Sequence, residues 1–127
     1  MNVRPEKIMC VNSWNGARSI IDRAINVGLA INTGRSRYRK VLKKDHGAFR
    51  VQKGSSSYNH VTYDRLETCW NELHCNGEFD SQTFDKHFAK DRRSSTCWTG
   101  VIGEIFVKAG LATRIQDWPL LYKEVGS

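Results

Sequence analysis

The chain has 127 residues, of which 39% are hydrophobic and 26% are charged, and its formal net charge is +7. This length and composition are those of one ordinary globular domain, so global disorder is not expected. No apolar run reaches the roughly 18 residues of a spanning helix, and the first residues lack the apolar segment of a secretory signal. We therefore expect an intracellular protein whose four cysteines are thiols rather than a disulfide framework.

The first predicted element is an amphipathic helix that begins near Ser13. Its apolar residues recur at helical spacing from Ala17 to Ile25, and charged residues take the opposite side. Gly28 follows at the place where a helix usually ends in a left-handed residue.

A short segment, 35–53, holds the positive charge. Eight of its residues are basic and only Asp45 is acidic, so it carries eight minus one, or +7, the net charge of the whole chain. A neutral body with one cationic segment indicates a polyanionic partner, although a solvated hairpin without a partner has the same composition. The residues expected to contact phosphates are Arg35, Arg37, Arg39, Lys40, Lys43, Lys44, Arg50 and Lys53.

This cationic segment is predicted to form a β-hairpin. Its strands, 37–42 and 48–53, are joined at 45–47 by Asp-His-Gly, residue types that favour a turn. Alternation along the strands is expected to send the cations outward and to turn three side chains toward the core: Tyr38, Phe49 and Val51.

The second half of the chain, 58–127, is predicted to hold three helices and a terminal strand pair. The polar stretch 54–57 separates it from the first half, 1–57, and we expect both halves to pack as one compact domain. Helical spacing and capping residues place the helices at Thr62–Cys75, at Ser81–Ala89 and from Thr99 to Gly110, and the strands at 112–116 and 120–125.

The order of these elements resembles the winged helix-turn-helix superfamily of DNA-binding domains. The residues that carry the resemblance cover about half of the chain: Thr62–Cys75, Ser81–Ala89 and SSTCWTGVIGEIFVKAGLATRI, from Ser94 to Ile115. A polar start, a glycine-containing third helix and Ala-Gly-Leu leading into a strand are how many such domains present a recognition helix and begin their wing.

The resemblance implies that the third helix lies in the major groove of DNA, with its first residues nearest the bases and phosphates. The contact positions it implies are Ser94, Ser95, Thr96, Trp98 and Thr99, then Lys108 on the helix and Arg114 in the wing. The exposed face of this helix offers only Glu104 and Lys108, and lacks the Arg, Asn and Gln side chains that read bases. Such a unit can instead be a protein-interaction module or a plain three-helix core.

No metal site is expected. Cys69, His74 and Cys75 lack the spacing of a zinc knuckle, and neighbouring residues on a helix point about 100° apart. Whether these three, or His87 and Cys97 further along, bind a metal stays open at this point.

A small metal-dependent nuclease is one alternative reading. Asp45 and His46 at the hairpin turn, with His60 and Asp64 nearby in the chain, are residue types that suit a general base or a metal. No recognisable nuclease motif accompanies them, and Asp45 is equally explained as a turn residue.

We therefore expect an α+β protein, with an N-terminal helix and a basic β-hairpin followed by a winged-helix-like unit. The favoured function is non-enzymatic binding of nucleic acid, with duplex DNA preferred, the hairpin on the phosphates and the third helix in a groove. No cofactor and no membrane partner is expected. The first alternative is an inhibitor or adaptor whose hairpin meets an acidic protein surface. A role in gene regulation, in a phage or in a mobile element would each be consistent with the favoured function.

Overall fold

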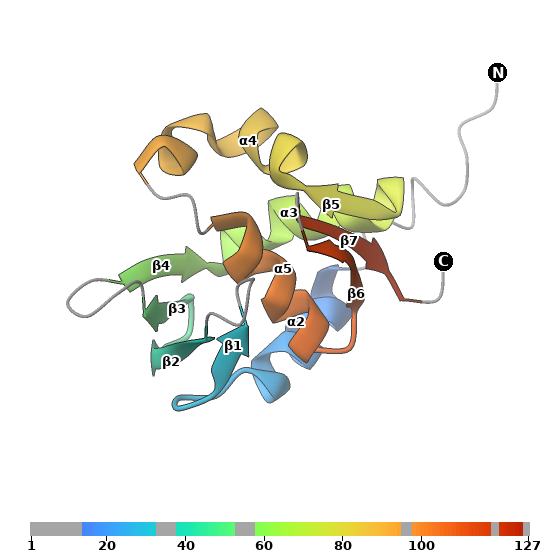
Figure 1. Ribbon diagram of the computed structural model, residues 1–127. Coiled ribbons are helices and arrows are strands. Elements are labelled where there is room, and N and C mark those ends of the chain that lie inside the picture. Colours follow the sequence, from blue (N-terminus) through green and yellow to red (C-terminus); the bar gives the residue numbers. More distant parts are fainter. Residues whose placement is uncertain (1–13, 33–37, 53–57, 95–97, 118–119, 126–127) are drawn as a thin grey trace, which may run out of the picture.

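The computed structural model shows a mixed α+β protein (Figure 1). It describes residues 14–32, 38–52, 58–94, 98–117 and 120–125, and of 91–94 the backbone alone. Four helices and two antiparallel sheets make up this part, and the N-terminal helix is followed by a hairpin, so the predicted fold class is confirmed. In chain order the elements are α2 (Trp14–Ala24), β1 (Ala30–Asn32), β2 (Tyr38–Lys44), β3 (Ala48–Gln52), β4 (Tyr58–Thr62), α3 (Tyr63–Asn76), β5 (Glu78–Asp80), α4 (Ser81–Ser94), α5 (Trp98–Lys108), β6 (Ala112–Asp117) and β7 (Leu120–Glu124).

Helix α2 buries one side and exposes the other. Trp14, Ala17 and Ile21 are buried about one helical turn apart, and Ile25 continues the stripe just beyond the helix. Gly28 then adopts a φ of +93°, a left-handed conformation that side chains disfavour, and the chain turns back into β1. The predicted helix is confirmed, and Gly28 is left-handed as predicted, but the helix ends four residues earlier, at Ala24, and the backbone N–H of Gly28 donates to the carbonyl of Val41 on β2 rather than to the helix.

The first sheet has four antiparallel strands in the order β1-β2-β3-β4, so each strand pairs with its neighbour in the chain. The sequence predicted only the two central strands. Strands β3 and β4 pair across the predicted division of the chain, with Ala48 opposite Thr62 and Gln52 opposite Tyr58. The inner face of the sheet is formed by buried side chains: Ile31, Val41, Phe49, Val51, Asn59 and Val61.

Tyr38 lies on the other face of this sheet. Val41 takes an inner position opposite Val51, and alternation then sends Tyr38 and Lys40 outward. Tyr38 is 62% exposed, so the prediction that it turns toward the core is wrong. Phe49 and Val51 are buried as predicted.

Local capping sets the ends of α3 and the start of α4. The Thr62 hydroxyl oxygen accepts a hydrogen bond from a first-turn backbone N–H at 3.1 Å, and Gly77 ends α3 with a φ of +82°. The next cap differs from the prediction, because the Asp80 carboxylate, rather than Ser81, accepts a hydrogen bond from the backbone N–H of Thr83 at 2.9 Å. Aspartate caps a helix as well as serine does, and it stands one residue earlier.

The second sheet has three antiparallel strands in the order β5-β7-β6. The hairpin β6–β7 is the predicted terminal strand pair, and β5 is a short additional strand between α3 and α4. Phe79 on β5 stands opposite Tyr122 on β7, and both side chains are fully buried.

Helix α5 runs through the middle of the molecule (Figure 1). All nine residues from Trp98 to Phe106 are buried, because α5 contacts α2 and β1 of the first half as well as α4, β5, β6 and β7. Glu104 is only 4% exposed, so the prediction that it lies on an exposed face is wrong. One continuous cluster of buried side chains includes residues of both halves of the chain. No helix of the described part is long and apolar enough to cross a membrane.

Candidate nucleic-acid interface

The outward side of the four-stranded sheet carries most of the described cationic residues of the hairpin. Because the inner face is defined by buried valines on β2, β3 and β4, the alternate positions point away from the core. We call this surface the outer sheet face; it consists of Tyr38, Lys40, Leu42, Lys43, Arg50, Gln52, Tyr58 and His60.

One row of this face brings three nitrogen-bearing side chains together across three strands. Lys43 on β2 stands opposite Arg50 on β3, which stands opposite His60 on β4. Like charges directly opposite each other destabilise a sheet, so the Lys43–Arg50 pair costs stability in the free protein. Within the described ranges no carboxylate lies at ion-pair distance from Lys43, Arg50 or Lys40.

Asp45, at the turn beside this row, is the acidic group that acts on it electrostatically. Its carboxylate accepts a hydrogen bond from the backbone N–H of Gly47 at 2.9 Å, which is the main reason why the pKa of Asp45 is lowered. His60 and Lys43 lower the pKa of Asp45 further by their charge. Asp45 therefore holds the turn, and it compensates only a part of the cationic row.

Two tyrosines add aromatic surface to the same face. Tyr38 is 62% exposed and Tyr58 is 45% exposed, so both side chains offer aromatic surface to the solvent. The guanidinium of Arg50 lies 4.8 Å from the centre of the Tyr58 ring, a cation–π contact. The sequence interpretation missed Tyr58 and considered His60 only as a possible nuclease residue; the signal for this strand was the alternation in Tyr58–Thr62, where Asn59 and Val61 are buried.

The other predicted hairpin cations are not on this face. Arg35, Arg37 and Lys53 lie outside the described residues. Arg39 stands opposite Ile31, on the inner side of the sheet, and is half-buried. Lys44 is turned toward α2.

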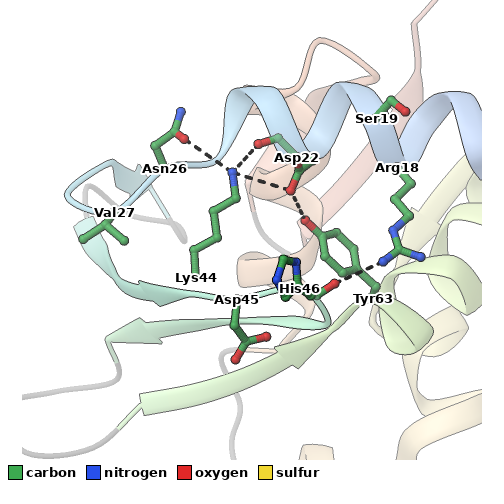
Figure 2. Close-up of a pocket in the computed structure, with 9 residues that line it drawn as sticks. All are labelled: Arg18, Ser19, Asp22, Asn26, Val27, Lys44, Asp45, His46 and Tyr63. Carbon is green, nitrogen blue, oxygen red and sulfur yellow. Dashed lines mark hydrogen bonds and ion pairs between the residues drawn. The ribbon is translucent and has the colours of Figure 1, made fainter.

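Lys44 lies in an open pocket of about 830 Å³ between α2 and the hairpin turn (Figure 2). Its ammonium group donates to the backbone carbonyl of Asp22, and it lies 3.6 Å from the Asp22 carboxylate and 3.4 Å from the Asn26 side-chain oxygen. The Tyr63 hydroxyl donates to the same carboxylate at 2.8 Å. The hydrogen bond from Tyr63, with the charge of Lys44 as a further cause, lowers the pKa of Asp22. The protein's own groups thus bind the Lys44 ammonium. The prediction that Lys44 contacts phosphate is therefore corrected: Lys44 has a structural role and links the hairpin turn to α2.

Arg18 closes the same pocket from α2. Its guanidinium donates to the backbone carbonyl of His46 at 3.1 Å and lies 4.5 Å from the centre of the Tyr63 ring. The contacts of Lys44 and Arg18 therefore hold α2 against the hairpin turn.

The residues that suggested a nuclease lie at separate positions in the structure. Asp45 is occupied by its turn, His46 lines the pocket, and His60 lies on the outer sheet face. Asp64 is in the first turn of α3. In the part of the chain that the structure describes, no three His, Cys, Asp or Glu side chains are grouped so that they could hold a metal ion.

The cysteines and histidines of the possible zinc set have other neighbours. Cys69 is buried, and burial raises the pKa of its thiol. His74 stacks on Trp70 and pairs with the Glu124 carboxylate, and His87 lies 3.2 Å from Glu72. Cys75 is exposed, and Cys97 lies outside the described residues.

Two of the positions that the winged-helix resemblance implied for DNA contact are buried in the structure. Trp98 and Thr99 are 7% and 5% exposed, and the Trp98 ring stacks on Phe84 of α4, so both are removed from the candidate interface. Lys108 is exposed at the last turn of α5. Ser95 and Thr96 lie outside the described residues, and so does the side chain of Ser94.

Arg114 belongs to a polar cluster that the sequence did not predict. Its Nε lies 3.6 Å from the buried Glu104 carboxylate and 3.3 Å from that of Asp117. Burial raises the pKa of Glu104, and the Tyr122 hydroxyl and the Arg114 guanidinium offset only part of this effect. Arg114 is therefore engaged by the protein's own carboxylates.

Comparisons with protein-family models, with curated proteins and with solved structures found no match to this chain. The resemblance to the winged helix-turn-helix superfamily accordingly stays a prediction.

Proposed function

We propose that this protein binds nucleic acid without catalysing a reaction on it, and that the outer sheet face is the binding surface. The observation that carries the proposal is the Lys43–Arg50 pair, two like charges that stand opposite each other next to the register shift in β2, with no ion-pair partner among the described residues. Lys40 on the same face adds a third cation.

Binding of a polyanion removes the electrostatic repulsion between these two cations. Phosphates placed over Lys43 and Arg50 turn mutual repulsion into attraction, and each neutralised phosphate releases counterions. The cations are solvated at the surface, so binding requires little desolvation of buried charge. The exposed tyrosines favour nucleic acid over an acidic protein surface, because bases offer flat aromatic partners to such rings.

The proposal does not use α5 as a recognition helix. The succession α3, β5, α4, α5, β6 and β7 has the predicted order of three helices before a strand pair. In this chain, however, α2 and β1 pack on α5. The expected preference for duplex DNA relied in part on a helix in a groove, and this part of the expectation is not carried over.

A matched pair of charge-reversal variants tests the proposal. The first changes three cations of the outer sheet face, Lys40, Lys43 and Arg50, to Glu. The second changes three exposed cations on other elements, Arg23, Lys90 and Lys123, to Glu. Each reversal changes the charge by two units, so both variants go from +7 to +1 and differ only in where the charge was altered.

The measurement is a fluorescence titration with labelled single-stranded and duplex oligonucleotides at several salt concentrations. We expect the wild-type affinity to fall steeply with salt, and the first variant to lose most of its affinity and about two units of its log–log salt slope. The second variant is expected to retain most of its affinity. The proposal is overturned if the wild type binds neither oligonucleotide at low salt, or if both variants weaken binding equally.

A further inference from the structure

We infer that the outer sheet face takes a single strand of nucleic acid, with bases stacked on Tyr38 and Tyr58 and phosphates on Lys40, Lys43 and Arg50. This inference rests on the proposed function and names the class of nucleic acid.

The first argument is the width of the surface. The major groove of duplex DNA is about 12 Å wide and admits a helix or a two-stranded ribbon. Four strands spaced about 4.8 Å apart span roughly 14 Å between the outer strand axes, before side chains are added. A face of this width lies across a duplex and touches its phosphates, and it cannot bring Tyr38 or Tyr58 to the base edges inside a groove.

The second argument is the exposure of the tyrosines. Both are on regular strands, and within the described ranges the ring of Tyr38 has no aromatic or cationic partner. A base can stack on an exposed aromatic ring, and this stacking suits every base. The bases of a duplex are already stacked on one another, whereas those of a single strand are available.

The third argument is the order of aromatic and cationic side chains on the face. Val41 on β2 stands opposite Val51 on β3. The next pair along these antiparallel strands is therefore Lys40 with Gln52, and Gln52 in turn stands opposite Tyr58 on β4. Tyr38 is two residues beyond Lys40 on the same face. Strand geometry places the Cα atoms of Tyr38 and Tyr58 roughly 12 Å apart.

The contact between Arg50 and Tyr58 places a phosphate-binding cation next to a ring on which a base can stack. The Arg50 guanidinium, 4.8 Å from the centre of the Tyr58 ring, holds the ring and puts a positive charge beside it. Tyr58 still keeps 45% of its surface exposed. A base stacked there has a phosphate-binding cation as its neighbour, which is the combination that single-strand binding surfaces use.

The test is a competition among three probes of one mixed sequence: single-stranded DNA, single-stranded RNA and duplex DNA, at one salt concentration. We expect at least one of the single strands to bind about tenfold more tightly than the duplex. The double variant Tyr38→Leu with Tyr58→Leu keeps an apolar side chain at both positions but removes the aromatic faces, and we expect it to lose about tenfold or more in single-strand affinity. The matched variant Tyr38→Phe with Tyr58→Phe keeps the aromatic faces and is expected to bind as the wild type does.

The outcomes separate this inference from the proposed function. Equal affinity for single strand and duplex, or unchanged single-strand affinity in the leucine variant, overturns the inference and leaves nucleic-acid binding intact. Absence of binding to all three probes overturns the proposed function itself. A thermal unfolding curve for each variant verifies that the exposed substitutions leave the fold in place.

Discussion

The ring of Tyr122 lies directly against the backbone of α5 at Gly103. A Cβ atom on Gly103 would stand 2.1 Å from the Cε2 atom of Tyr122, far inside van der Waals contact. Tyr122 is fully buried in the middle strand of the second sheet, so its ring has little room to move away. Glycine at this position thus allows the central helix and the second sheet to approach each other closely.

Gly103→Ala is therefore expected to destabilise the protein by about 1–3 kcal/mol, the usual cost of overpacking a core. Gly16→Ala is the matched control, because nothing lies within 4 Å of the added Cβ atom and Gly16 is in the exposed part of α2. The control is expected to be stabilised by roughly 0.5–1 kcal/mol through helix propensity. Chemical denaturation of both variants measures these changes, and a neutral Gly103→Ala would contradict the close contact.

The buried carboxyl of Glu104 predicts a particular dependence of stability on pH. Its pKa is raised by burial above the ordinary value of 4.5, so the folded state holds the proton more tightly than the unfolded state. The stability that this group contributes is therefore present below pH 4.5 and is lost as the pH rises through the raised pKa.

Glu104→Gln removes this titration. We expect the variant to gain stability relative to the wild type as the pH is raised from 4 to 7. Unfolding midpoints measured along this pH series verify the prediction. A growing loss of stability in Glu104→Gln at neutral pH would mean instead that the Arg114 pair outweighs the burial of the charge.

Lys43 and Lys44 are adjacent in the chain but have different roles: Lys43 belongs to the outer sheet face, and Lys44 contacts α2. Lys43→Met is expected to lower nucleic-acid affinity and its salt dependence, because it removes a cation of the outer sheet face, and to leave stability almost unchanged. Lys44→Met is expected to cost up to about 1 kcal/mol of stability, because it breaks the tie to Asp22, and to leave affinity near that of the wild type. Binding and unfolding data on both variants test this division, and a reversed result would contradict the orientation of β2.

Much of the local structure was predictable, because it depends on residues close together in the chain. The buried stripe of α2, the Thr62 cap and the left-handed glycines Gly28, Gly77 and Gly110 follow from spacing and residue type alone. The alternation of Phe49 and Val51 likewise identified the central strand of the first sheet.

The orientation of β2 was not predictable in the same way. Val41 and Leu42 are adjacent apolar residues in an otherwise polar strand, so either could define the inner face. The register shift between Val41 and Lys43 also interrupts simple alternation. Only the pairing of Val41 with Val51 shows that Tyr38 and Lys40 point outward.

The burial of α5 and the role of Lys44 depend on contacts between distant parts of the chain. Glu104 and Lys108, one helical turn apart, suggested a solvent-facing side. The structure covers that helix with α2 and β1, and it holds Glu104 near Arg114 of β6. In the same way Lys44 meets Asp22, a residue 22 positions earlier, only because α2 packs beside the hairpin turn. Such tertiary contacts leave no periodic signal in the sequence.

The most direct test of the binding surface is to follow the backbone amide signals of the protein by NMR while a single-stranded oligonucleotide is added. We predict that the largest shifts fall on β2, β3 and β4, at the residues of the outer sheet face, with small changes on α4, β6 and β7. Shifts concentrated on α4, β6 and β7 while the four-stranded sheet stays unperturbed would contradict this account.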